Sequence, residues 1–180
     1  EGASRVGHPV VDDFNAGDML GVGYTESLIR DGKRESTATA YLRPAMGRRN
    51  LTVETHAHAH RLIIENGRCT GVEYVRDGTP MRASGGEMIL CGGTVGSPHL
   101  LMLSGIGPAA ELAALGIEPL IDAPQVGRNL QDHILLAGIR YKAERPLPPS
   151  QMQTGATLLS KVDEGRHGPD LHLNVMNIDY

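Results

Sequence analysis

The feature that most constrains the fold lies near the middle of the chain, where an apolar run is followed by glycines and then by a second apolar run. The first run, Glu87–Cys91, predicts a short buried strand. Gly92 and Gly93 then allow a sharp turn, and Ser97 and Pro98 suit the N-cap and the first position of a helix. A strand, a glycine turn and a helix N-terminus together make a place where backbone can closely approach a phosphate or a ribose.

Composition argues against several classes of protein. The 180 residues are 40% hydrophobic, which is enough for one domain or for parts of two. The net charge is −4 and there is no basic block, so we expect no nucleic-acid partner. No run approaches the ~18 apolar residues of a membrane span, and we expect none. Cys69 and Cys91 lie in apolar strand patterns without a Cys-x-x-Cys spacing, which predicts two buried free thiols, a reducing compartment and a cytoplasmic location.

An antiparallel meander of three strands is predicted before the glycine turn. Ala57–Glu65 and Cys69–Arg76 are joined by Asn66-Gly67, a strong hairpin signal. Asp77-Gly78 marks a second turn before Met81–Ser84. The remaining expected elements are shorter: strands at 21–29, 51–55, 117–121, 133–141 and 170–174, and helices at 37–46, 99–104 and 108–115, the last two ended by Gly105 and Gly116.

The segment Gly93–Gly107 resembles the second sequence signature of the glucose-methanol-choline (GMC) family of flavin oxidoreductases at every defined position. Three further segments are similar to the family, in family order. Gly32–Leu42 resembles the segment before the central FAD-contacting strand, and Asn50–Thr55 resembles the entry to that strand. Val126–His133 resembles the loop that follows the signature. The resemblance is greatest to choline and aliphatic-alcohol dehydrogenases.

This resemblance implies a mixed α/β fold (α+β mixed): part of an FAD-binding domain with its antiparallel meander, plus part of the antiparallel sheet of a substrate domain. Residues 1–35 and 133–180 would belong to the substrate-binding domain, and residues 36–132 to the FAD-binding domain. The implied cofactor is FAD, and the implied partner is a small-molecule alcohol. In such enzymes a base takes the hydroxyl proton while hydride passes from the alcohol carbon to the flavin.

Four residues are candidates for binding FAD. Ala59 falls where the family uses a backbone N–H and C=O to pair with the adenine edge; the alternative is an ordinary strand alanine. Cys91, Gly92 and Gly93 would run close to the adenosine half of FAD, at the carboxyl end of a strand. The alternative there is that the glycines only permit tight packing of helix on strand.

Two other groups of residues invite a chemical role that we do not assign. On a strand His56, His58 and His60 point to one face and could share a metal ion, but no cysteine or carboxylate is placed nearby, so we predict no metal site. Asp132 and His133 are adjacent and would face opposite sides of a strand, which favours a structural role over a proton relay.

A Gly-x-Gly-x-x-Gly turn and the histidine-bearing segment of complete GMC enzymes are not found in this sequence. We therefore expect an internal fragment with no catalytic residue of its own, inactive alone and prone to self-association through uncovered apolar strands. The alternative is a shortened, non-catalytic relative that acts as a binding or structural module. A nicotinamide dehydrogenase is disfavoured by the missing glycine fingerprint and by the antiparallel strands.

Overall fold

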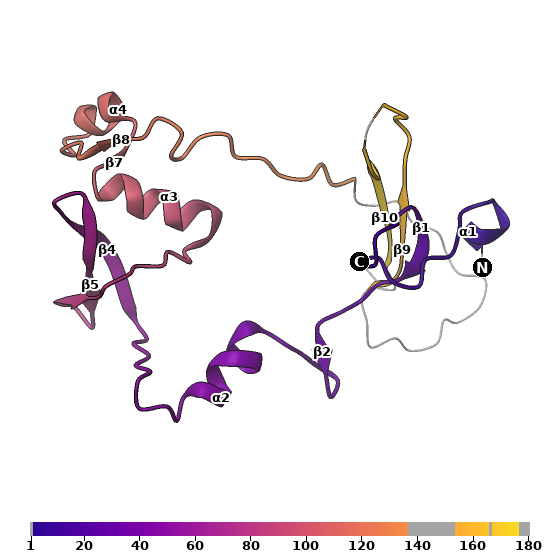
Figure 1. Cartoon of the computed structure of the whole chain (residues 1–180), viewed down its shortest axis with the longest axis horizontal. Coiled ribbons are helices and arrows are strands. Elements are labelled where there is room, and N and C mark those ends of the chain that lie inside the picture. The colour runs from indigo at the N-terminus through magenta and orange to yellow at the C-terminus, as the bar shows by residue number, and fades with distance from the viewer. Residues whose placement is uncertain (1, 137–153, 166, 177–180) are drawn as a thin grey trace. The chain divides into compact units, whose positions relative to one another are not determined.

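The structure is a computed structural model that describes residues 2–136, 154–165 and 167–176 (Figure 1). The chain forms two compact units. Unit 1 comprises residues 1–48 and 140–180, and unit 2 comprises residues 49–139. The expected assignment of segments to cofactor-binding and substrate-binding domains stays a prediction.

The antiparallel meander predicted from the sequence is present in unit 2. Strands β4 (Ala57–Glu65), β5 (Arg68–Arg76) and β6 (Thr79–Ser84) form one sheet in the order β4-β5-β6. The first turn, Asn66-Gly67, has φ values of 51° and 76°, the two left-handed residues that a tight hairpin requires. Gly71 is needed in β5, because a Cβ there would lie 2.5 Å from the carbonyl oxygen of a β6 residue.

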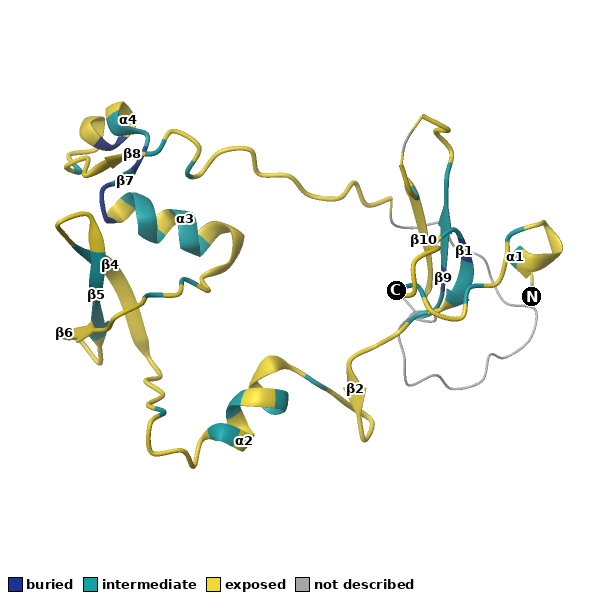
Figure 2. Cartoon of the chain, viewed as in Figure 1, coloured by how far each residue is buried: buried dark blue, intermediate teal, exposed yellow. Residues whose placement is uncertain are grey.

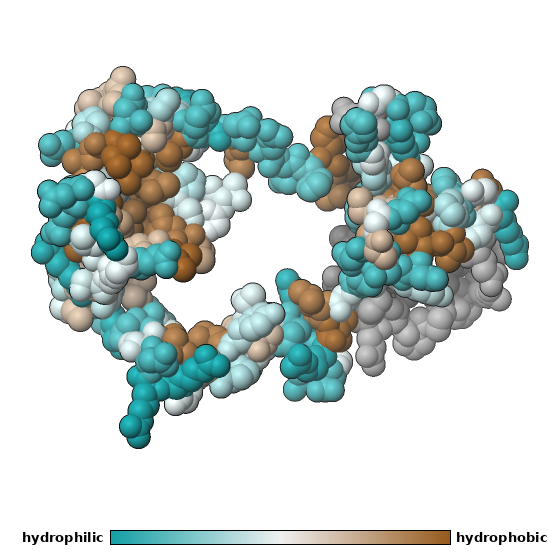
Figure 3. Space-filling model, viewed as in Figure 1, coloured by the Kyte–Doolittle hydropathy of each residue, from teal (hydrophilic) through white to brown (hydrophobic). Residues whose placement is uncertain are grey.

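The rest of unit 2 packs against the meander through helix α3 (Gly93–Leu103). A parallel pair of short strands, β7 (Ile106–Gly107) and β8 (Ile121–Asp122), brackets helix α4 (Ala109–Ala114). Leu112 of α4 is 1% exposed and Leu62 of β4 is 5% exposed, and these are the buried hydrophobic residues of the described chain. Figure 2 shows dark-blue buried residues at β7, and Figure 3 shows apolar residues gathered over α3 and the β7 segment.

Unit 1 is built on a sheet of three antiparallel strands. Strands β1 (Gly21–Tyr24), β9 (Thr154–Ser160) and β10 (Leu171–Met176) lie in the order β1-β9-β10. A Cβ on Gly21 would lie 2.4 Å from the carbonyl oxygen of Pro9, and a Cβ on Gly23 would lie 2.8 Å from the ring of Phe14. Both glycines therefore allow the segment 9–14 to lie directly on one face of the sheet.

The other elements of unit 1 are short: α1 (Gly2–Arg5), β2 (Ile29–Arg30), β3 (Lys33–Arg34), the π-helix η1 (Ala38–Leu42) and α2 (Arg43–Ala45). The π-helix has a local cause in Pro44. A proline has no N–H to give to the carbonyl four residues earlier, and its ring clashes with that carbonyl. The N–H of Arg43 instead reaches back five residues to the carbonyl of Ala38. The helix expected at 37–46 is thus present but widened at its start.

The mixed fold with antiparallel sheets is confirmed, and several local predictions are wrong. The strand expected at 117–121 is reduced to β8 (Ile121–Asp122), and Cys69 is half-buried rather than buried. Residues 87–91 form no strand; Ile89 is 78% exposed, and Cys91 is exposed rather than buried. Residues 51–55 also form no strand. The helix expected from residue 99 begins at Gly93, so Ser97 is not its N-cap. Residues 133–136 are not in a strand, and the rest of the predicted strand at 133–141 lies outside the described residues.

Within residues 2–136, 154–165 and 167–176, each helix is too short or too polar to cross a lipid bilayer.

Candidate functional site

The turn that leads into α3 is held by a side chain of the helix it precedes. The hydroxyl oxygen of Ser97 accepts a hydrogen bond from the Gly92 N–H at 3.0 Å. A Cβ on Gly92 would lie 2.9 Å from the backbone nitrogen of Ser97, so the close approach requires glycine. Gly92 is therefore required by the close approach of the turn to its own helix, and a contact of Gly92 with FAD stays a prediction.

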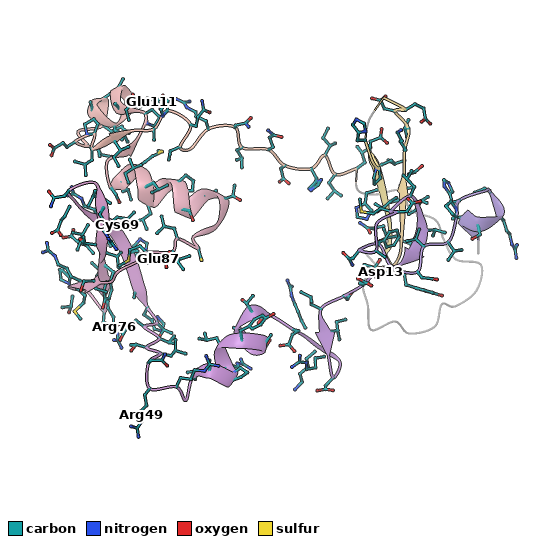
Figure 4. All side chains as sticks on the ribbon, in the orientation of Figure 1. Asp13, Arg49, Cys69, Arg76, Glu87 and Glu111 are labelled. Carbon is teal, nitrogen blue, oxygen red and sulfur yellow. The ribbon has the colours of Figure 1, made fainter. Side chains whose placement is uncertain are left out.

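Gly93 has a different environment. Its φ is +75°, a left-handed conformation that side-chain-bearing residues rarely adopt, and apart from its chain neighbours and the backbone of its own helix no atom lies within 4 Å of where a Cβ would be. The neighbouring helix start has no side-chain cap. Because the first N–H groups of a helix have no partner within the helix, this start offers backbone donors beside open space. Figure 4 marks Glu87 on the connection that leads from β6 into this turn.

Ala59 lies in β4, the strand at one edge of the meander. The pairing of β4 with β5 shifts register between Ala59 and Arg61, where one extra residue is inserted into β4. An extra residue reverses the alternation of the backbone groups. Ala59 therefore directs its N–H and C=O toward the same side of the strand as Leu62, which is the side away from β5.

The side of β4 away from β5 is fixed to α3 by a buried serine. Ser104, at the C-cap of α3, is 0% exposed. Its hydroxyl oxygen accepts from the Leu62 N–H at 2.8 Å and donates to the Leu100 carbonyl at 2.6 Å. The two backbone candidates, the edge of β4 and the turn before α3, thus belong to elements that are packed together in one unit. Ser104 lies near the end of the segment Gly93–Gly107 that resembles the family signature, but nothing local in the sequence indicates its hydrogen-bond partner.

The loop after α4 is also tied into unit 2. Glu111 of α4, labelled in Figure 4, forms an ion pair with Arg128. A Cβ on Gly127 would lie 2.9 Å from the sulfur of Met102 in α3. The segment that resembles the family's loop after its signature therefore packs on the same helix that carries the glycine turn.

The three histidines do not form one row. His56 precedes β4 and has a φ of +56°, and the inserted residue interrupts the alternation beyond it. The rings of His58 and His60 meet edge to face with centroids 4.9 Å apart. In the described part of the chain, no group of three or more histidine, cysteine, aspartate or glutamate side chains is arranged to hold a metal ion. The His133 N–H donates to its neighbour Asp132 Oδ1 at 2.7 Å, a local contact outside any strand.

An open hollow on the meander was not anticipated from the sequence. Its volume is about 620 Å³, and it is lined by His60, Glu73, Tyr74, Val75, Pro80, Met81 and Arg82. Glu73 and Arg82 form an ion pair across neighbouring strands at 2.6 Å. These residues come from three strands and share no motif, so only the strand register brings them together.

Known proteins are similar to this chain over most of its length. A protein-family model described as GMC oxidoreductase matches residues 1–135. The mitochondrial choline dehydrogenase of Homo sapiens is 43% identical over 148 residues, which are 82% of this chain and 25% of that protein. The oxygen-dependent choline dehydrogenase of Sinorhizobium medicae (strain WSM419) is 44% identical over 135 residues, or 74% of this chain and 24% of the relative.

One solved structure is also similar to this chain over nearly all of its length. The crystal structure of pyridoxine 4-oxidase from Mesorbium loti superimposes with a TM-score of 0.87 at 36% identity, covering 96% of this chain and 35% of that one. The chain spans about a quarter of the length of the curated relatives. FAD is the cofactor of the matched domain, which confirms the cofactor prediction. The chain belongs to the GMC oxidoreductase family.

Proposed function

We propose that this chain is the part of an FAD-dependent alcohol oxidoreductase that holds the adenosine half of FAD. The observation that carries the proposal is the start of α3, where the left-handed Gly93 faces open space beside an uncapped helix N-terminus. Backbone N–H groups at such a terminus favour a negatively charged or strongly accepting partner. Cys91 and Gly92 lead the chain into this turn.

The edge of β4 suits the adenine end of the same cofactor. The inserted residue turns the backbone N–H and C=O of Ala59 away from β5. One donor and one acceptor on a strand edge match the neighbouring acceptor and donor on the edge of an adenine ring. Recognition by backbone tolerates a side chain as small as alanine, and Ala59 is exposed.

When bound, FAD supplies the flavin that accepts hydride from the carbon of an alcohol. The residues of this chain bind and orient the adenosine half, and we assign no catalytic base among the described residues. The substrate is proposed to be a small alcohol of the kind named for the relatives, such as choline or pyridoxine. The chain alone is expected to oxidise no alcohol, and its self-association and cytoplasmic location stay predictions from the sequence.

A titration with two flavins tests the proposal. FAD and FMN share the isoalloxazine ring, but only FAD carries the adenosine half. We expect the chain to quench or polarise FAD fluorescence, to leave FMN fluorescence unchanged and to release FAD when ADP is added. Equal binding of both flavins, or no binding of FAD, would overturn it.

Two variants locate the contact with adenine. Ala59→Pro removes one N–H that points away from β5, which an edge strand tolerates, and should weaken FAD binding. Ala59→Ser keeps the backbone groups and should bind FAD as the wild type does. Activity is then measured on the full polypeptide that carries this chain, with choline, pyridoxine and benzyl alcohol as the panel of substrates.

A further inference from the structure

Three polar side chains on the sheet of unit 1 are joined in a row across its strands. The hydroxyl of Thr25, just after β1, lies 2.8 Å from the hydroxyl of Thr157 in β9. The Thr157 hydroxyl in turn donates to the side-chain oxygen of Asn174 in β10 at 2.9 Å. Thr157 is only 6% exposed, so the middle of this row is shielded from water.

The direction of the hydrogen bonds follows from the number of hydrogens. A threonine hydroxyl has one hydrogen, and that of Thr157 is given to Asn174 Oδ1. Thr25 must therefore donate to Thr157 rather than accept from it. The row ends with the oxygen of the Asn174 amide fixed toward Thr157, and this leaves the amide nitrogen Nδ2 turned the other way.

The amide nitrogen of Asn174 is available for a further partner. Side chains of alternating residues share one face of a strand, so Gly21, Gly23 and Thr25 lie on the face that carries Thr157 and Asn174. The segment 9–14 covers the two glycines, whereas Asn174 is exposed. Among residues 2–136, 154–165 and 167–176, no protein atom accepts a hydrogen bond from Nδ2 of Asn174.

An oriented asparagine in this position is unusual for a strand that only needs to be stable. Asparagine is depleted in strands, where β-branched and aromatic side chains pack better. The opposite face of β10 follows this rule with Leu171, Leu173 and Val175. Asn174 therefore makes β10 less stable than a β-branched residue would, and in return its amide presents one N–H donor in a fixed direction.

We propose that Asn174 is a substrate-binding residue whose Nδ2 donates a hydrogen bond to an oxygen atom of the alcohol. Thr157 and Thr25 are positioning residues that hold the amide oxygen and so prevent the amide from turning over. The inference rests on the proposed function and on the sequence-based prediction that residues 1–35 and 133–180 belong to the substrate-binding domain. The chemical class of ligand is an uncharged or anionic oxygen acceptor, because the row presents a neutral donor.

The test uses the full polypeptide loaded with FAD and the alcohol of the panel that it oxidises with the highest kcat/KM. Asn174→Asp keeps an oxygen that accepts from Thr157, replaces the Nδ2 donor by an acceptor and adds a negative charge. We expect KM to rise about tenfold or more, with a smaller change in kcat and an unchanged flavin absorption spectrum. Val175→Thr changes the opposite face of β10 with little change in volume, and should leave KM unchanged.

A second pair of variants tests the positioning role. Thr157→Val removes the hydroxyl and lets the Asn174 amide rotate, so KM should rise about threefold, and Thr157→Ser should restore it. If Asn174→Asp does not fold, these two Thr157 variants still test whether the row contributes to substrate binding. An unchanged KM in the aspartate or valine variants, with only a lower Tm, would show a purely structural row and overturn the inference. A wild-type protein that binds no FAD or oxidises no alcohol would instead overturn the proposed function, and this inference with it.

Discussion

Replacing Ser104 by alanine removes the hydroxyl that joins α3 to the outer edge of β4. The Leu100 carbonyl keeps a second donor, because the Ser104 backbone N–H also reaches it at 3.1 Å. The Leu62 N–H loses its acceptor in a position where Ser104 is 0% exposed and Leu62 is 5% exposed. Leaving a buried donor unsatisfied costs about 1–3 kcal/mol. We therefore expect the free energy of unfolding of unit 2 to fall by about 2 kcal/mol.

Urea unfolding of the whole chain measures this change. With a slope of about 2 kcal/mol/M, the midpoint should move by about 1 M. Native-state hydrogen exchange gives a second measurement, since the Leu62 amide should lose protection more than its neighbours in β4. Ser84→Ala, at the exposed end of β6, is the matched control and should change stability by less than about 0.5 kcal/mol. If Ser104→Ala behaves like this control, the hydroxyl does not hold the two elements together.

Three further outcomes are expected of the same chain. Gly71→Ala places a Cβ 2.5 Å from a backbone oxygen of β6, and in urea unfolding it should destabilise unit 2 by about 1–3 kcal/mol. The control Gly47→Ala, which places a Cβ where nothing lies within 4 Å, should be nearly neutral in the same assay. Leu112→Ala, at a side chain 1% exposed, should cost about 2–5 kcal/mol, against less than about 0.5 kcal/mol for Leu115→Ala at 74% exposed. Cys91 is exposed and Cys69 is half-buried, so iodoacetamide should modify Cys91 first in the folded chain. Mass spectrometry of timed digests measures the two rates, and equal rates would contradict the prediction.

The meander was predictable because the signals that specify it, the strand patterns and the turn residues, lie close together in the sequence. Each strand of the hairpin Ala57–Arg76 carries its own pattern, and Asn66-Gly67 fixes the turn between them. The structure gives β4 the bounds Ala57–Glu65 that the sequence predicts. The left-handed Gly105 and Gly116 likewise end their helices where expected, with φ values of 81° and 74°.

The strand predicted at Glu87–Cys91 failed because an apolar run specifies burial and does not specify a partner. A strand forms only when a second strand accepts its backbone hydrogen bonds, and the described residues offer none to this segment. The prediction that Ser97 is the N-cap of the helix failed because the local sequence did not determine where the helix begins. Serine followed by proline suits a helix start, but the helix begins earlier, and the hydroxyl of Ser97 reaches back to Gly92 from inside it.

The candidate site also has a part that the sequence predicted and a part that it did not. Gly92 and Gly93 were visible as a motif, and the resemblance pointed to Ala59 through its place after Asn50. The register shift that turns the backbone of Ala59 outward could not be seen, because a bulge depends on the pairing of two strands. The row from Thr25 to Asn174 was invisible for the same reason, since nothing in either segment indicates that the two pair across β9.

The sheet of unit 1 has a consequence for the order in which the chain acquires its structure. Thr25 and Thr157 are 132 residues apart, and all of unit 2 lies between the strands that they join. Closing a loop of that length costs on the order of 4 kcal/mol of chain entropy before any contact of the sheet is made. On the ribosome, at about 5–20 residues per second, β1 waits roughly ten seconds for β9 to be synthesised. The meander of unit 2, whose strands are neighbours in the sequence, can fold within that interval, before the sheet of unit 1 is able to close.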